Sequence, residues 1–343
     1  MMRTWLRLIS AWVFALGLVL GAIVLVRDMP ERLAASWSGV AAALPVILIA
    51  AALVAAIIWL LDRSHAQVRS AWALAFVWGA VGACGLALQI NGFASDAVLD
   101  VLGDPGATTW SAALIGPIDE ETIKGAGVAL LLVMYRDRVG RPMQAFAIGA
   151  FAGLGFQVVE NVTYAATFAL RHAQSDVTGA LTVAIMRALF GFQSHWVYTG
   201  LFAVGLVLLR TRLPLGLLAI VLAYLLHFWW NAPSGDNPVV ILLLILAKCA
   251  VTLSVLTAVW LWMLFEQRRW LGWAIRTPEA LQLAPPGELG ALPTRALRRN
   301  AQQYMRFYYG PQFAEVTAQR QKWLLRELTY RVGSGRSSPE HHR

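Results

Sequence analysis

The sequence predicts an all-α protein, a polytopic membrane helical bundle with about eight transmembrane helices and a basic cytoplasmic C-terminal tail. Hydrophobic residues make up 58% of the 343 positions, whereas charged residues make up 14%. Soluble domains carry about 25% charged residues, and the mean hydropathy here is +0.60. A soluble globular protein is therefore excluded. The two cysteines, Cys84 and Cys249, lie in apolar runs, which indicates helix packing rather than a disulfide framework.

Eight apolar runs are long enough to cross a bilayer as helices, which takes about 20 residues each. The runs are continuous and rich in Ala and Leu, whereas the strands of a membrane barrel alternate between polar and apolar residues. The predicted spans are approximately Trp5–Val26, Val40–Leu61, Ala71–Ile90, Trp110–Tyr135, Pro142–Phe168, Phe192–Leu209, Leu215–Trp230 and Pro238–Phe265. The first run is longer than the core of a signal peptide, so we expect a retained anchor.

The distribution of arginine predicts that both chain termini face the cytoplasm. One set of span ends carries nine Arg residues, which are Arg3, Arg7, Arg63, Arg69, Arg136, Arg138, Arg141, Arg210 and Arg212. The opposite ends carry four, which are Arg27, Arg32, Arg171 and Arg187. Because basic residues accumulate on the cytoplasmic side, we expect a multi-pass protein of the plasma (inner) membrane. The segment 91–109 has three Asp and no basic residue, which is typical of an external loop.

These features divide the chain into three expected segments. Residues 1–109 form an N-terminal segment of three helices with the external loop, residues 110–265 form a membrane core, and residues 266–343 form the tail. The tail holds thirteen Arg or Lys and six Glu, so it contributes +7 of the net charge of +9. Two weakly amphipathic stretches follow a Pro/Gly-rich link in it, and we expect them to lie on anionic lipid headgroups. No nucleic acid is expected as a partner, since no motif for it is present.

Two carboxylates and an ammonium group lie inside the fourth predicted span. Glu120, Glu121 and Lys124 are flanked by the apolar runs 110–118 and 125–135. An ionisable group within lipid costs several kcal/mol unless it is partnered, so the cluster predicts a functional site. The spacings i,i+4 and i,i+3 place both glutamates on the same helix face as the lysine. The alternative is a solvated loop end, which the apolar flanks disfavour.

Three later spans add further polar residues. Glu160 and Asn161 lie in the fifth span, His195 in the sixth, and His227 and Asn231 in the seventh. The last two are i,i+4 neighbours and therefore share a helix face. At a rise of 1.5 Å per residue, Glu120 lies roughly 15 Å and Glu160 roughly 12 Å below the outer face, and His227 lies about 5 Å from the outer end. We therefore expect these groups to meet in the outer half of the membrane, although each alone is also compatible with a polar packing contact.

The chemistry of this set indicates hydrolysis by an activated water. Glutamate and histidine supply a general base and metal ligands, and the carboxamide supplies a donor to an oxyanion. No convincing Ser or Cys nucleophile accompanies the set, and the sequence has no HExxH motif.

The motifs resemble those of the PrsW family of intramembrane proteases, which is related to the type II CAAX prenyl endopeptidases. The family's EExxK matches residues 120–124, its FxxxEN matches residues 156–161, its single-histidine helix matches His195, and its HxxxN matches residues 227–231. The resemblance covers roughly residues 70–265 and excludes the tail. It implies an endopeptidase that cuts membrane-anchored protein substrates near the outer membrane face. The best-known family role is the first, outside-facing cut of an anti-sigma factor.

The resemblance implies a role for each matching residue. Glu120 would be the general base, and Glu121 and Lys124 would set its charge state. His227 and Asn231 would stabilise the oxyanion.

The same resemblance leaves the need for a metal open. Glu160, supported by Asn161, and His195 would bind water or a metal ion. Glu160, His195 and His227 are together a potential Zn²⁺ site, because two His and one Glu leave an open position. Related prenyl endopeptidases carry histidine where this sequence has Glu160, which leaves the role of that position open. A glutamate-activated water needs no ion, and of the two mechanisms we favour the metal-free one.

Two other function classes account for part of the pattern. A non-catalytic scaffold, similar to the multi-span gamma-secretase subunit of the same superfamily, would keep the histidines for packing. It would not need Glu120, Glu121 and Glu160. A proton-coupled transporter relays protons through acids and histidines, but we find no pair of broken helices in matching halves of the sequence. The sequence therefore favours the protease.

Overall fold

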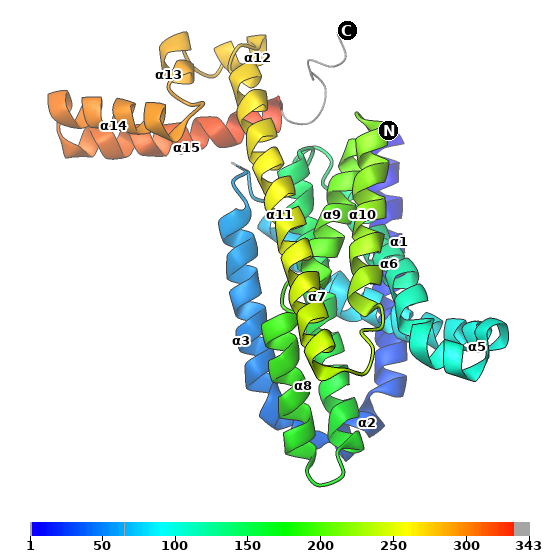
Figure 1. Ribbon diagram of the computed structural model, residues 1–343. Helices are drawn as coiled ribbons and strands as arrows, with labels where there is room; N and C mark the ends of the chain where they lie inside the picture. Colours follow the sequence, from blue (N-terminus) through cyan, green and yellow to red (C-terminus); the bar gives the residue numbers. More distant parts are fainter. Residues whose placement is uncertain (1, 65, 333–343) are drawn as a thin grey trace. The chain divides into compact units, whose positions relative to one another are not determined.

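The structure is a computed structural model that describes residues 2–64 and 66–332 (Figure 1), and these residues form helices and no strand. They divide into two compact units. The first contains the described residues of Met1–Leu61, Arg69–Met134 and Ala145–Thr257, and the second contains those of Asp62–Val68, Tyr135–Gln144 and Ala258–Arg343. The predicted segment boundaries after residues 109 and 265 fall within single helices, α5 and α11.

The first unit is a helical bundle. Its elements are α1 (Met2–Asp28), α2 (Pro30–Ala35), α3 (Trp37–Leu61), α4 (Arg69–Val77), the π-helical η1 (Trp78–Ala83), α5 (Cys84–Leu114), α6 (Gly116–Met134), α7 (Pro142–Arg171), α8 (Asp176–Phe190), α9 (His195–Leu208), α10 (Leu213–Asn231) and the start of α11 (Pro238–Ala274). Helix α6 packs against α1, α5, α9 and α10, and α3 packs against α8. Helix α6 therefore lies inside this bundle.

Two glycines let α7 lie directly on the backbone of α9. A Cβ built on Gly153 would lie 2.2 Å from the carbonyl oxygen of His195, and one on Gly149 would lie 2.3 Å from that of Thr199. Small residues at such crossings are typical of membrane helices. The close approach fixes the start of α9, where His195 stands, against the middle of α7.

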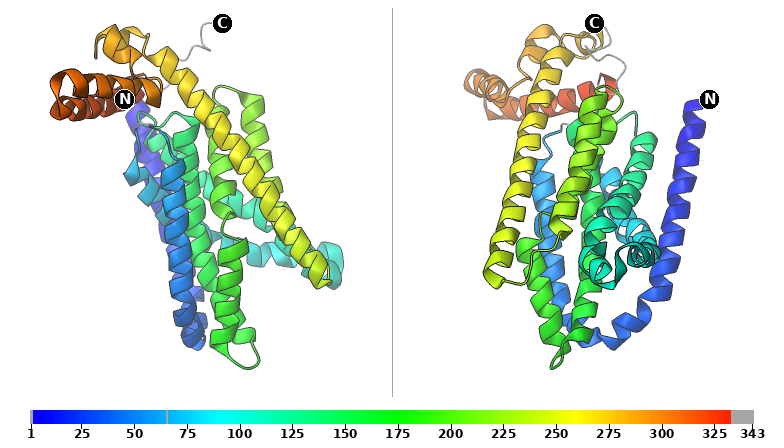
Figure 2. Two further views of the ribbon diagram at one scale, coloured as in Figure 1. Left: turned by 60° about the vertical axis from the view of Figure 1, so that its left-hand side comes forward. Right: turned by 45° about the vertical axis from the view of Figure 1, so that its right-hand side comes forward.

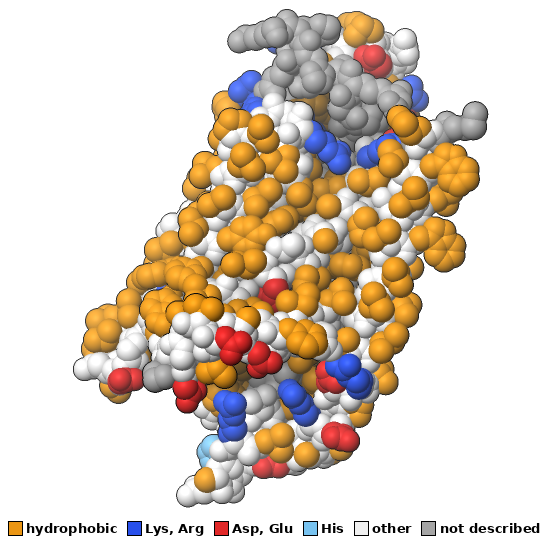
Figure 3. All heavy atoms as spheres, turned by 90° about the vertical axis from the view of Figure 1, so that its right-hand side faces the viewer, with side chains coloured by type: hydrophobic (Ala, Val, Ile, Leu, Met, Phe, Trp, Pro, Cys, Tyr) orange, Lys and Arg blue, Asp and Glu red, His pale blue; other side chains and the backbone are white. Residues whose placement is uncertain are grey.

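Six helical segments are long and apolar enough to cross a membrane, or seven if the bent pair α8 and α9 is one span. The six are Thr4–Asp28, Trp37–Leu61, Arg69–Asp104, Pro142–Arg171, Leu213–Asn231 and Pro238–Ala274. Helix α6 is not among them, because it carries Asp119 besides Glu120, Glu121 and Lys124. Large apolar side chains cover much of the face shown in Figure 3, as lipid contact requires. The count of eight and the orientation of the termini remain predictions.

Two segments differ from their predicted form. The expected external loop 91–109 is helical, since α5 continues through it with an interruption at Gly103, whose φ is 71°. The sixth predicted span, Phe192–Leu209, is preceded by a further helix, α8, and the two helices meet at an angle of 44°. Ser175 caps the start of α8 by accepting a hydrogen bond from Thr178 N.

The second unit gives the tail a core of its own. It contains the end of α11, the short helices α12 (Pro278–Leu281) and α13 (Pro286–Gly290), and the longer α14 (Arg295–Tyr309) and α15 (Pro311–Arg331). Helices α14 and α15 pack side by side (Figure 2), joined at Gly310, whose φ is 99°. Its buried core consists mainly of Leu271, Leu289, Leu292, Leu324, Leu325 and Leu328. The described part of the tail is therefore a folded unit, and its contact with lipid remains a prediction.

Candidate active site

Four helices of the first unit bring the candidate residues together. Helix α6 supplies Glu120, Glu121 and Lys124, whereas the other groups come from α7, α9 and α10. The α6 residues and both histidines are buried, and Glu121 and Lys124 have no exposed surface. Glu160 and Asn161 lie on α7, His195 is the first residue of α9, and His227 and Asn231 lie on the last turns of α10.

Lys124 is the central cation of the cluster. Its Nζ lies 2.6 Å from Glu121 Oε1 and 3.5 Å from Glu120 Oε2. The same atom lies 3.0 Å from His195 Nδ1. The ring of Phe156, the first residue of the FxxxEN motif, packs under the ammonium at 4.2 Å, a cation–π contact. The charge of the buried ammonium is thus balanced by two carboxylates, and a ring nitrogen and an aromatic ring complete its surroundings among the described residues.

Glu121 is held in place by three hydrogen-bond donors. Besides Lys124, Thr199 Oγ1 donates to its Oε2 at 2.8 Å. His227 Nδ1 lies 3.0 Å from its Oε1. A fully buried carboxylate needs such partners to remain charged. Both oxygens of Glu121 are therefore engaged, and the residue has no free oxygen to act as a base.

The partners of the two histidines assign their tautomers. An ammonium only donates hydrogen bonds, so His195 Nδ1 accepts from Lys124 and its Nε2–H points to Glu160 Oε2 at 2.9 Å. The Nδ1–H of His227 is donated to Glu121, which leaves a lone pair on Nε2. That lone pair lies 3.8 Å from Glu120 Oε2. In this tautomer, His227 Nε2 can accept a hydrogen bond but cannot donate one.

Glu120 is the carboxylate with a free oxygen facing the cluster. Its Oε2 is buried and accepts no hydrogen bond from the residues that the structure describes. The nearest polar atoms are Lys124 Nζ at 3.5 Å and the ring nitrogens His195 Nδ1 and His227 Nε2, both at 3.8 Å. These separations exceed those of direct hydrogen bonds, so a water that contacts Glu120 Oε2 and a ring nitrogen would lie to one side of the line that joins them.

Glu160 is paired with a cation that the sequence analysis placed outside the site. The guanidinium of Arg187, on α8, forms an ion pair with Glu160 Oε2 and donates from Nε to Asn161 Oδ1. It also lies over the ring of Tyr164 at 4.1 Å. Arg187 is counted in the sequence analysis among the four arginines at the opposite span ends, because no helix is predicted there at α8. Thr199 was also missed, although its position four residues after His195 places both on one helix face.

The break between α8 and α9 is stabilised by side chains. Ser194 Oγ and Gln157 Nε2 both donate to the carbonyl of Gly191, at 2.7 Å and 3.2 Å. Gln193 Nε2 donates to the carbonyl of Phe190 at 2.7 Å. Carbonyls freed at a helix break within a membrane need such partners. The motif residue Gln157 therefore helps to hold the helix start that carries His195.

Asn231 lies next to Glu120, but its side chain donates a hydrogen bond to the backbone of α5 rather than to Glu120. Its Nδ2 donates to the carbonyl of Ala112, at the end of α5, at 3.0 Å. A Cβ built on Gly116 would lie 3.2 Å from Asn231 Nδ2 and 3.4 Å from Glu120 Oε1. The carboxamide is thus adjacent to Glu120, and its hydrogen bond goes to a backbone carbonyl.

A metal ion would meet a different donor set from the predicted one. Among the described residues, Glu120, His195 and His227 offer ligand atoms within 4.8 Å of one another. Glu160, which the sequence analysis included in place of Glu120, bonds to His195 and Arg187 instead. Two imidazoles and a carboxylate fit zinc in donor type. However, the Lys124 ammonium already occupies His195 Nδ1 and would have to move away.

Comparison with curated proteins and with solved structures yields no match. The family model described as PrsW family intramembrane metalloprotease matches residues 67–265, more than half of the chain. The matched region contains the four motifs and every contact of the buried cluster described above. The chain therefore belongs to the PrsW family of intramembrane metalloproteases.

Proposed function

We propose that the protein hydrolyses a peptide bond of membrane-anchored proteins and that Glu120 is the general base. The observation that carries this proposal is the environment of Glu120 Oε2. This oxygen is buried, faces two ring nitrogens at 3.8 Å, and accepts no hydrogen bond from the described residues. A water that donates to Glu120 Oε2 and to His227 Nε2 would turn an oxygen lone pair toward a substrate carbonyl.

The reaction then follows from the positions of the donors and acceptors. Glu120 takes a proton from the water as its oxygen attacks the carbonyl carbon, which gives a tetrahedral oxyanion. Glu120 next returns the proton to the amide nitrogen as the C–N bond breaks, which releases a carboxylic acid and an amine, and the acid then passes its proton to the amine or to solvent. The Lys124 ammonium, 3.5 Å from Glu120 Oε2, stabilises the negative charge that Glu120 carries before it takes the proton and after it returns it.

The oxyanion donor in this proposal is Asn231. His227 was expected to share this role, but its Nδ1–H is donated to Glu121, so its Nε2 orients the water instead. Asn231 Nδ2 lies beside Glu120 across Gly116 and donates to one backbone carbonyl. An incoming peptide carbonyl that displaces Ala112 O would receive that hydrogen bond.

The donor set also defines what a metal would do here. A zinc ion held by Glu120, His195 and His227 would supply Lewis-acid polarisation of water. The chain's own residues would still have to orient the substrate, and Lys124 would have to release His195 Nδ1.

The orientation is likewise a proposal. The excess of arginine at one set of helix ends supports cytoplasmic termini and a site in the outer half of the plasma membrane. Substrates would then be single-span proteins cut near their outer end.

Co-expression with tagged single-span substrates tests the proposed function. We expect the wild-type chain to yield a shortened product and the Glu120→Gln variant to yield none at equal protein level. The matched control is Glu31→Gln, the same change at an exposed position on α2. A Glu120→Gln variant that still cuts would refute the role of this residue, and a scaffold would show no cleavage in any form.

A further inference from the structure

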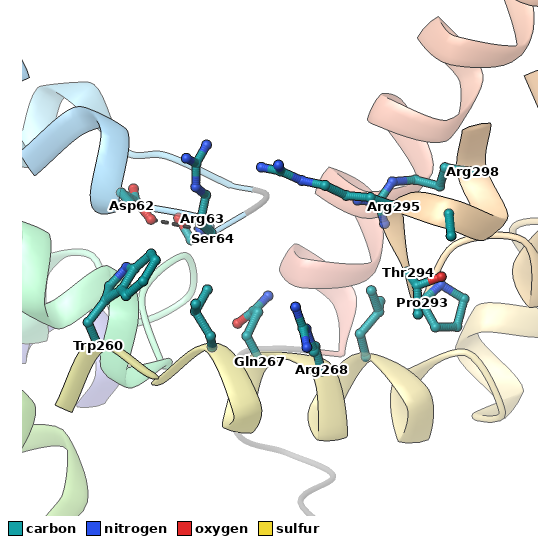
Figure 4. A pocket seen from close by; sticks show the side chains of 13 residues that line it. Asp62, Arg63, Ser64, Trp260, Gln267, Arg268, Pro293, Thr294, Arg295 and Arg298 are labelled. Atoms are coloured by element: carbon teal, nitrogen blue, oxygen red, sulfur yellow. Dashed lines mark hydrogen bonds between the residues drawn. The ribbon is translucent and has the colours of Figure 1, made fainter. Parts of the chain in front are cut away.

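The second unit contains a cavity that the proteolytic site does not use. It has a volume of about 710 Å³, which is within the usual range of small-molecule sites. Three segments of this unit surround it (Figure 4): the turn 62–64, the end of α11 from Trp260 to Leu271, and residues 293–298 at the start of α14.

Positive charge dominates the wall of this cavity. Its lining includes Arg63, Arg268, Arg295 and Arg298 but one carboxylate, that of Asp62. Within the described part of the chain, none of the four arginines lies within 4.0 Å of a carboxylate oxygen. Arginines elsewhere in the same unit do form such pairs.

Those paired arginines show that the second unit contains carboxylates that pair with arginine outside the cavity. Arg320 pairs with Glu288 at 3.2 Å, and Arg331 pairs with Glu327 at 2.7 Å. At the cavity, burial and then the nearby charge of Arg295 lower the pKa of the partly buried Arg298. The Arg298 guanidinium donates to the carbonyl of Leu292, but none of the four has a carboxylate partner among the described residues. Such a group of guanidinium groups around one space is typical of an anion site.

Buried polar atoms in the same wall also lack partners. Gln267 is 8% exposed, points from α11 into the cavity, and its Nε2 donates to no described residue (Figure 4). Ser64 Oγ is also buried, and its one polar neighbour among the described residues is the Asp62 carboxylate, with no hydrogen bond of regular geometry. Polar atoms that are buried without a hydrogen bond destabilise a fold unless a ligand or water satisfies them. Both side chains would be satisfied by oxygen atoms of a ligand.

The one acid narrows the class of ligand. Asp62 Oδ1 accepts from Ser64 N at 2.7 Å, whereas its buried Oδ2 has no hydrogen-bond partner among the described residues. A carboxylate oxygen repels a phosphate oxygen but accepts from a hydroxyl group. The site therefore offers donors for a phosphate and one acceptor for a sugar or inositol hydroxyl, beside the indole of Trp260.

We propose that this cavity binds an organic phosphate that carries hydroxyl groups, with Arg63, Arg268, Arg295 and Arg298 around the phosphate and Asp62 on a hydroxyl. The start of α14, at Arg295, adds the positive end of a helix dipole to the same wall. Two sources have this chemistry, a soluble nucleotide and the headgroup of a phosphoinositide. The full-length protein would thereby carry a ligand-binding unit separate from its proteolytic residues.

The test uses full-length protein in phosphatidylcholine nanodiscs. One arm titrates labelled ATP and labelled inositol trisphosphate from solution. The other compares nanodiscs with and without phosphatidylinositol bisphosphate, using unlabelled inositol trisphosphate as competitor. Saturable binding in either arm supports the site and identifies its source, whereas absence of binding in both arms overturns it.

Variants connect any binding to this cavity. The double variant Arg295→Gln/Arg298→Gln should weaken binding about 10- to 100-fold, because each removes a charge-assisted hydrogen bond. The matched control Arg299→Gln/Arg306→Gln changes the net charge equally on the same helix, at positions that do not line the cavity. It should bind within about twofold of wild type.

A second variant guards against misfolding. Gln267→Leu removes an unpartnered buried donor, so the protein should stay folded while binding weakens. Equal loss of affinity in the cavity and control double variants would show nonspecific attraction to a basic tail and overturn the proposal. So would undiminished binding by folded Gln267→Leu and Arg295→Gln/Arg298→Gln proteins.

Discussion

The backbone of α9 lies so close to Gly153 of α7 that no space is left for a Cβ. One methyl group added at this position therefore tests the geometry of the site. In Gly153→Ala the new Cβ would lie 2.2 Å from the His195 carbonyl oxygen and 2.6 Å from its carbonyl carbon. An ordinary contact needs about 3.4 Å, so the helices must move apart by roughly 1 Å. His195 Nε2 is 2.9 Å from Glu160 Oε2, and such a movement would lengthen that hydrogen bond beyond its useful range.

The expected consequence is a loss of cleavage with retained folding. A displacement of about 1 Å among catalytic groups costs on the order of 100-fold in rate. We therefore expect the kcat of Gly153→Ala on a tagged single-span substrate to fall by about that factor. The control is Gly92→Ala on α5, where a Cβ meets nothing within 4 Å. Normal activity of a folded Gly153→Ala protein would refute the claim that α7 and α9 set the site by direct contact.

Three further predictions follow from single contacts. Thr199→Val removes the 2.8 Å hydrogen bond to Glu121, so kcat should fall about 10-fold with unchanged KM, measured with purified enzyme. Because Lys124 already occupies His195 Nδ1, activity should survive prolonged chelation, and loss reversed by zinc would contradict this. Burial raises the pKa of Asp62 to about 6 from 3.8, which favours the neutral acid in the folded state. Stability is therefore lost as pH rises through 6, and Asp62→Asn should stabilise the protein by roughly 3 kcal/mol at pH 7.5 but hardly at pH 4. Thermal unfolding at both pH values measures this, and a stabilisation that is equal at both would contradict it.

The α6 cluster shows what local spacing can predict. The i,i+3 and i,i+4 positions of Glu121 and Glu120 relative to Lys124 required contacts on one helix face, and the structure has both ion pairs. The same i,i+4 spacing places Thr199, four residues after His195, on the face of that histidine, but it was not used to predict Thr199 as a site residue. Helical periodicity is a local property, so it can be read from a sequence without knowledge of the fold.

Arg187 shows what local spacing cannot predict. The helix that carries it, α8, is shorter than a full membrane span and ends at a break. Hydropathy alone therefore did not predict that α8 and its arginine belong to the membrane core. The contact with Glu160 depends on how α8 returns against α7, which is a tertiary feature. The same reason applies to the tail, where Leu324 and Leu328 pack with Leu289 of a five-residue helix. Packing partners that lie far apart in the sequence leave no periodic signal.

The tautomers of the two histidines could not be predicted from the sequence either. The HxxxN motif suggested that His227 and Asn231 both donate to an oxyanion. In the structure Glu121 takes the Nδ1–H of His227, and this contact depends on the packing of α6 against α10. The different roles proposed for the two residues therefore rest on contacts that the sequence does not show.

The most direct measurement of the central claim is the cleavage rate of purified Glu120→Gln protein in nanodiscs on a single-span substrate. Glutamine keeps the size and one acceptor of Glu120 but takes no proton at neutral pH. We expect the rate to fall by at least about 1,000-fold, since a general base contributes 100- to 10,000-fold, with unchanged substrate binding and unfolding temperature. A Glu120→Gln protein that cleaves within about tenfold of wild type would contradict the account.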